Sequence, residues 1–69
     1  MTPTQIKKLR KALGMSTYEF GRELDVSHTT VSNLEHGQRN ATTYLADLNR
    51  LVRRLEIIRT AIAETATSR

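Results

Sequence analysis

The sequence contains no cysteine and no tryptophan, a single proline and only three glycines among its 69 residues. Without cysteine, the chain forms neither disulfides nor zinc-thiolate sites, and two histidines alone make a structural zinc site improbable. A chain of this length builds one domain with a small core. Its stability must therefore come from good helix packing or from association with a second subunit.

Long apolar runs are also missing. No stretch approaches the roughly 20 apolar residues that cross a bilayer, and the first five residues lack the basic and apolar regions of a signal peptide. We therefore expect a cytoplasmic protein that does not bind membranes.

The chemistry of an enzyme is absent as well. There is no cysteine nucleophile and no glycine-rich phosphate loop, and so short a chain cannot build a pocket around its Ser, His and Asp residues. His28 and His36 are not spaced as a metal-binding pair and have no acidic cluster beside them. We expect no enzymatic activity, no cofactor, no metal and no small-molecule ligand.

Basic residues are in excess, with 11 Lys and Arg against 7 Asp and Glu and a net charge of +4. Such an excess favours contact with a polyanion, although many small basic proteins bind no nucleic acid. Lys7, Lys8 and Lys11 form either a basic patch or the solvated face of a helix, and the solvated face is the simpler interpretation.

Two capping boxes mark the starts of the first two predicted helices. The Thr2 hydroxyl can accept from the amide of Gln5 while the Gln5 side chain reaches back, and Ser16 and Glu19 repeat the arrangement. Apolar residues follow each box at helical spacing. With Gly14 as the stop of the first, the predicted helices cover residues 3–13 and residues 17–24.

Ser27 caps a third predicted helix over residues 28–36, which Gly37 ends. The turn of residues 25–27 is very short, so the second and third helices must cross at a steep angle, which is the helix-turn-helix arrangement.

A longer helical stretch, capped by Thr42 or Thr43, runs from residue 44 to about residue 66 without Gly or Pro. Residues 65–69 are poor helix formers and are expected to fray. The whole pattern predicts an all-α chain of four to five helices with a long C-terminal helical segment. Along that segment apolar residues alternate at three and four positions, in a heptad-like stripe of Leu48, Leu51, Leu55, Ile58 and Ile62.

Residues 17–34, which read TYEFGRELDVSHTTVSNL, resemble the helix-turn-helix of the phage repressor and Cro type, also called XRE-like. The resemblance covers about residues 4–52. It implies a compact repressor-like domain that binds double-stranded DNA. The matching features are a small residue in the middle of the second helix, an apolar residue after the turn and an apolar pair in the third helix, namely Gly21, Val26, Val31 and Leu34.

The sequence departs from the usual family pattern at four positions. Thr17 stands where Gln is usual, and this weakens the transfer of a contact that the Gln makes with a phosphate. The remaining departures leave the fold intact and are Asp25 for Gly, Leu34 for Trp and Ala41 for Pro.

By this resemblance the third helix reads bases in the major groove. Asn33 can pair bidentately with adenine, and the methyl group of Thr29 can meet that of thymine. The outward polar set has no Lys or Arg, which favours sites containing A·T pairs. The alternative is an ordinary solvated polar face. The candidate base-contacting residues are His28, Thr29, Ser32 and Asn33.

The resemblance also implies phosphate contacts from both sides of the third helix. Amides at the start of the second helix and the loop after the third would run beside the DNA backbone. A merely solvated loop is the alternative. The candidate residues are Thr17, Gln38, Arg39 and Asn40.

Several members of this family bury an ion pair between their first and third helices, at the positions of Arg10 and Glu35 here. Buried charges persist only when they are partnered, so we expect this pair to form. The alternative is two unrelated surface charges.

The end of the chain carries more apolar surface than a small core needs. We expect a DNA-binding domain over residues 1–52 and a dimerisation extension over residues 53–69, with Arg54 and Arg59 at the rim of the interface. In the alternative, the chain bends near Arg53 and a fifth helix folds back. The expected dimer interface consists of Leu51, Leu55, Ile58 and Ile62.

These expectations combine into one functional hypothesis. The chain is a homodimeric transcriptional repressor that binds a palindromic operator, with half-sites about 34 Å apart. A protein-interaction adaptor or antitoxin that uses the same fold is the rival hypothesis.

Overall fold

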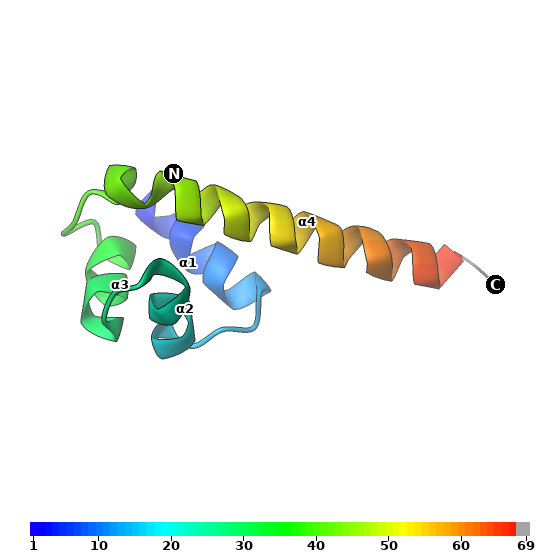
Figure 1. Cartoon of the computed structure of the whole chain (residues 1–69), viewed down its shortest axis with the longest axis horizontal. Coiled ribbons are helices and arrows are strands. Elements are labelled where there is room, and N and C mark those ends of the chain that lie inside the picture. The colour runs from blue at the N-terminus through cyan, green and yellow to red at the C-terminus, as the bar shows by residue number, and fades with distance from the viewer. Residues whose placement is uncertain (68–69) are drawn as a thin grey trace.

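The computed structural model describes residues 1–67 and is all-helical over that range. The first two of three short helices pack against the first half of a long fourth helix, the third packs against the first two, and the second half of the long helix projects past all of them (Figure 1). The molecule is therefore elongated, at 46 by 19 by 19 Å. Its elements are α1 (Pro3–Ala12), α2 (Thr17–Leu24), α3 (His28–Glu35), the 3-10 turn η1 (Ala41–Tyr44) and α4 (Leu45–Thr67).

Both predicted capping boxes are confirmed. At α1, Thr2 Oγ1 accepts the amide of Gln5 at 3.1 Å, and Gln5 Oε1 accepts the amide of Thr2 at 2.9 Å. At α2, Ser16 and Glu19 exchange the same two bonds, at 3.1 and 3.0 Å. The hydrogen bond from the Ser16 amide lowers the pKa of the Glu19 carboxyl. Local side-chain chemistry thus fixes where both helices begin.

The turns between helices use left-handed backbone. Gly14 and Gly37 adopt φ values of +70° and +75° after α1 and α3. Asp25 ends α2 at φ +57°, a conformation that Asp tolerates better than most residues. This single left-handed residue lets the chain reverse into α3 within three residues.

The predicted cap of the fourth helical stretch, Thr42 or Thr43, is wrong. Asn40 is the capping residue, because its Oδ1 accepts both the amide of Thr42 at 2.9 Å and the hydroxyl of Thr42 at 2.6 Å. The chain first makes the 3-10 turn η1, and α4 begins only at Leu45. A short Asn side chain bonding two residues ahead competes with Thr as a helix cap.

Every α-helix contributes two residues to one apolar core. The long helix supplies Leu48 and Leu51, both completely buried. Leu51 therefore lies inside its own domain, and its predicted place in a dimer interface is wrong. The buried core consists of Ile6, Leu9, Phe20, Leu24, Val31, Leu34, Leu48 and Leu51.

α4 is one unbroken helix of 23 residues. The alternative of a bend near Arg53 and a fifth helix that folds back is therefore wrong. Helix continues through Thr67, and residues 68 and 69 of the segment expected to fray lie outside the described residues. The Thr65 hydroxyl donates to the carbonyl of Ala61, one turn earlier in the helix, at 2.9 Å. No helix of the described chain is long and apolar enough to cross a membrane.

Candidate nucleic-acid interface

α3 has one buried and one polar side. Val31 and Leu34 point into the core with no exposed surface. The other side carries four polar residues, of which the first two are exposed and the last two half-buried: His28, Thr29, Ser32 and Asn33. The structure thus brings together on one face the four residues predicted to contact bases.

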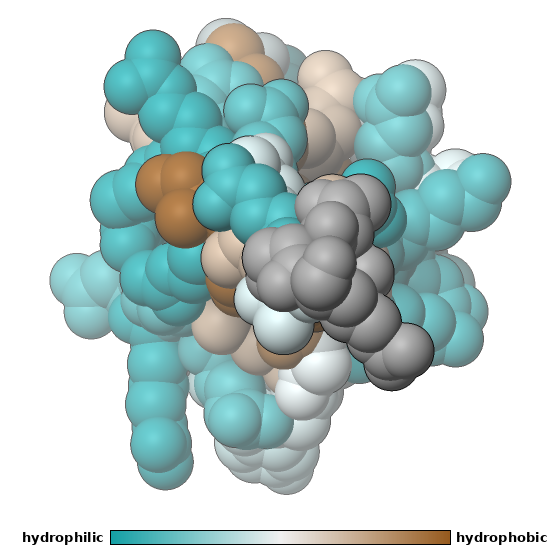
Figure 2. All heavy atoms as spheres, turned by 90° about the vertical axis from the view of Figure 1, so that its right-hand side faces the viewer, coloured by the Kyte–Doolittle hydropathy of each residue, from teal (hydrophilic) through white to brown (hydrophobic). Residues whose placement is uncertain are grey.

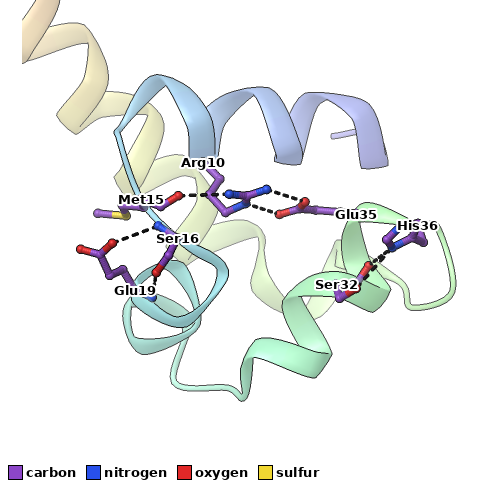
Figure 3. Close-up of polar contacts among 7 residues, drawn as sticks. All are labelled: Arg10, Met15, Ser16, Glu19, Ser32, Glu35 and His36. Atoms are coloured by element: carbon purple, nitrogen blue, oxygen red, sulfur yellow. Dashed lines mark hydrogen bonds and ion pairs between the residues drawn. The ribbon is translucent and has the colours of Figure 1, made fainter.

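Ser32 has partners within the protein. The His36 ring nitrogen Nδ1 lies 2.7 Å from the Ser32 carbonyl oxygen and 3.4 Å from Ser32 Oγ (Figure 3). A contact between Ser32 and DNA therefore competes with His36. His28, Thr29 and Asn33 are the stronger candidates on this face.

Gly21 sets how closely α2 and α3 approach. A Cβ atom at this position would lie 2.7 Å from the backbone oxygen of Val26, closer than real Cβ atoms come to other atoms. The Val26 amide also donates to the Gly21 carbonyl at 2.8 Å. The backbone of the turn and of the Ser27 cap lies directly against α2 here, so the turn holds the start of α3 close to α2.

An aromatic pair joins the first turns of these two helices, and the sequence reasoning missed it. The rings of Tyr18 and His28 are stacked, with centroids 4.1 Å apart and planes 24° from parallel. Tyr18 is 60% exposed. The sequence did carry a signal for this contact. Each of two helices joined by a short turn has an aromatic ring in its first turn.

The residues predicted to contact phosphate lie at the two ends of α3. Thr17 begins α2, next to Tyr18, and is therefore close to the start of α3. The other three are exposed in the loop that follows α3, and Asn40 already uses its side-chain oxygen as a cap. The structure does not bring all four residues into one cluster. It places them on two flanks of α3, with Thr17 near the start of α3 and Gln38, Arg39 and Asn40 after its end.

Arg10 and Glu35 form a bidentate ion pair between α1 and the last residue of α3 (Figure 3). Arg10 Nε lies 2.6 Å from Glu35 Oε2, and Arg10 Nη2 lies 3.1 Å from Glu35 Oε1. Arg10 Nη1 also donates to the Met15 carbonyl at 3.1 Å. The side chains are 14% and 5% exposed. The hydrogen bond to Glu35 raises the pKa of Arg10 against the opposing effect of burial.

Glu23 connects α2 to α4. Its carboxylate lies 2.5 Å from Arg54 Nη1 and 3.7 Å from Arg50 Nη1, and its backbone carbonyl accepts from Arg50 Nη2 at 2.9 Å. From the sequence, Arg54 was expected at the rim of a dimer interface. The structure gives both Arg50 and Arg54 a partner on α2, and these partly exposed contacts link α4 to α2.

The projecting part of α4 exposes large apolar side chains. Ile57, Ile58 and Ile62 are 69%, 42% and 63% exposed, whereas Leu55 is half-buried against the core. Seen from the end toward which α4 projects, apolar surface lies between polar side chains (Figure 2). Ile57 was missed because it falls outside the heptad-like stripe.

The described part of the chain contains no group of three or more His, Asp or Glu residues placed to hold a metal ion.

A family model described as helix-turn-helix matches residues 6–47, more than half of the chain. The matched segment begins in α1, includes α2 and α3, and ends in the first turn of α4. No curated protein and no solved structure matches significantly.

Proposed function

Because the chain belongs to the XRE-like helix-turn-helix family of DNA-binding domains, we propose that it is a sequence-specific repressor of transcription. The observation that carries this proposal is the polar outer face of α3, held on the domain by Val31 and Leu34. An α-helix fits the major groove, where each base pair presents its own pattern of donors and acceptors. A protein bound there across a promoter excludes the polymerase.

Two flanks would fix the register of α3 on the duplex. One flank, which would face one stretch of the DNA backbone, consists of Thr17 and the first-turn amides of α2. The other flank consists of residues 38–40 and would face another stretch of the DNA backbone. Such contacts set position and contribute to the affinity for any sequence, but they carry no base information. The net charge of +4 supports the same role.

Asn33→Ala is expected to weaken operator binding by about 1–3 kcal/mol and to relax the preference at one base pair, because an amide pairs with adenine through two hydrogen bonds. The operator is first selected from a random DNA pool. Titration against that operator and its single-base variants then measures the effect. Unchanged affinity and unchanged base preference would show that Asn33 reads no base.

Arg39→Ala is the matched comparison. It is expected to weaken binding to all sequences alike and to reduce the salt slope by about 1, as loss of one phosphate contact does. A wild-type protein that shows no salt-dependent DNA binding would instead favour the adaptor hypothesis.

We place dimerisation in the extension of residues 53–69 and operator reading in residues 1–52. A single helix-turn-helix reads too few base pairs for useful specificity, so two copies would bind a palindrome with half-sites about 34 Å apart. The exposed isoleucines support this, since monomeric proteins rarely leave such apolar surface uncovered. The proposed interface comprises Leu55, Ile58 and Ile62, with Ile57 added and Leu51 removed.

The double variant Ile58→Asp, Ile62→Asp is expected to be monomeric where the wild-type protein is dimeric, because it places charges within the proposed apolar contact. Sedimentation at tens of micromolar measures this. Ala63→Asp, an exposed position on the same helix that does not lie on the face of the isoleucines, serves as the control and is expected to remain dimeric. A monomeric wild type, or a double variant that still dimerises, would exclude this interface.

A further inference from the structure

The stack between Tyr18 and His28 lies at the surface that is proposed to face DNA. His28 is the first residue of α3 and Tyr18 the second residue of α2. Both are exposed, so the contact is not a consequence of filling the core. The ring centroids nevertheless lie 4.1 Å apart with the planes 24° from parallel, so the two rings are stacked in direct contact.

The backbone positions of both residues are fixed by the surrounding structure. The Ser16–Glu19 capping box sets the start of α2, and the Ser27 cap sets the start of α3. The close approach at Gly21 fixes the crossing of the two helices. Only side-chain rotation is left open at His28, and the stack restricts it.

The stack covers one face of the imidazole and leaves its edge available. Neither ring nitrogen of His28 has a hydrogen-bond partner within the described residues, and Tyr18 is the contact that the structure gives to this ring. A neutral imidazole carries one donor and one acceptor at fixed positions on that edge. The direction of the ring therefore decides which groups of a base it can meet.

We propose that Tyr18 is a positioning residue for His28 and thereby determines the base preference at the base pair that His28 reads. This inference rests on the proposed function in DNA binding. Holding the ring in one orientation before binding removes the loss of rotamer freedom that a mobile side chain suffers when it is immobilised. It also excludes base edges that the ring would meet in another rotamer.

The test compares Tyr18→Ala with Tyr18→Phe, alone and combined with His28→Ala, on the selected operator and on variants of each of its base pairs. The operator position that loses discrimination in His28→Ala is the base pair that His28 reads. Tyr18→Ala is expected to lower operator affinity about 2- to 10-fold and to reduce discrimination at that same base pair. Tyr18→Phe keeps the stack and is expected to match the wild type. In the His28→Ala background, Tyr18→Ala is expected to add no further loss.

Three results would overturn the inference. An equal loss on operator and random DNA that adds to the effect of His28→Ala would make Tyr18 a phosphate contact. A loss with Tyr18→Phe would assign the effect to the hydroxyl group. Unchanged operator affinity and base preference in Tyr18→Ala would show that the stack is dispensable.

Proton NMR of the free protein tests the stack without DNA. The ring protons of His28 are expected to be shifted upfield in the wild type and in Tyr18→Phe, and to return toward ordinary values in Tyr18→Ala, because an aromatic ring shields protons above its face. Unshifted His28 protons in the wild type would contradict the stack itself.

The DNA titrations separate the proposed function from the inference about Tyr18. If neither the wild type nor Asn33→Ala shows any base preference, the proposed function fails. If Asn33→Ala loses base preference and Tyr18→Ala does not, only the inference about Tyr18 fails.

Discussion

Arg10→Met and Glu35→Leu, each made alone, are expected to lower the free energy of unfolding by about 3–5 kcal/mol, because each strands the opposite charge in a mostly buried site. The two side chains are only 14% and 5% exposed and satisfy each other through two hydrogen bonds. Small domains have only about 5–15 kcal/mol of stability in total. Urea denaturation followed by circular dichroism is expected to show each single variant largely or partly unfolded.

The double variant Arg10→Met, Glu35→Leu separates a stranded charge from a lost contact. It is expected to be far more stable than either single variant, since two apolar side chains of similar size leave no charge behind. Some loss is still expected, because Arg10 also donates to the Met15 carbonyl. Small effects of the single variants that simply add in the double variant would mean that the two residues act independently.

Gly21→Ala is expected to destabilise the protein by about 1–3 kcal/mol, toward the upper end, because the new methyl group meets backbone and not a flexible side chain. The sign of the effect is itself informative. Alanine in place of glycine inside a helix normally stabilises by about 0.5–1 kcal/mol. Operator affinity is expected to fall as well, since relief of the clash moves α3 away from α2.

The same urea titration measures the stability of Gly21→Ala. Arg22→Ala, at the next and exposed position of the helix, is the control and is expected to change stability by no more than about 0.5 kcal/mol. A Gly21→Ala protein as stable as the wild type would show that the backbone of the turn does not lie as close to α2 as the 2.7 Å between the added Cβ and the Val26 oxygen requires.

Local chemistry explains why much of the fold could be predicted from the sequence. The Thr2 and Ser16 capping boxes act within four residues, and Gly14 and Gly37 end helices through their own backbone freedom. None of these signals depends on what the helix packs against. The apolar spacing in α3 likewise separates its inner face from its polar face without knowledge of the neighbours.

The features that were missed all depend on which helices meet. The heptad-like stripe predicts that Leu51 lies on the apolar face of a helix. It does not predict whether the rest of the same domain or a second subunit covers that face. Arg54 and Glu23 are 31 residues apart, and no pattern in the sequence pairs them. The stack of Tyr18 on His28 likewise needs the crossing angle of two helices, which a resemblance based on apolar positions does not specify.

The stiffness of α4 has a consequence for how two bound domains would cooperate. A flexible tether would hold a second domain near the duplex over a range of separations, at an effective concentration that changes slowly with distance. An unbroken 23-residue helix, clamped to α2 through Glu23, allows almost no such range. In the proposed dimer, the paired helices therefore hold the second domain at one separation from the first. Its effective concentration is high at a half-site at that separation and close to zero at a half-site at any other separation. The operator's spacing then becomes as strong a criterion for binding as its bases.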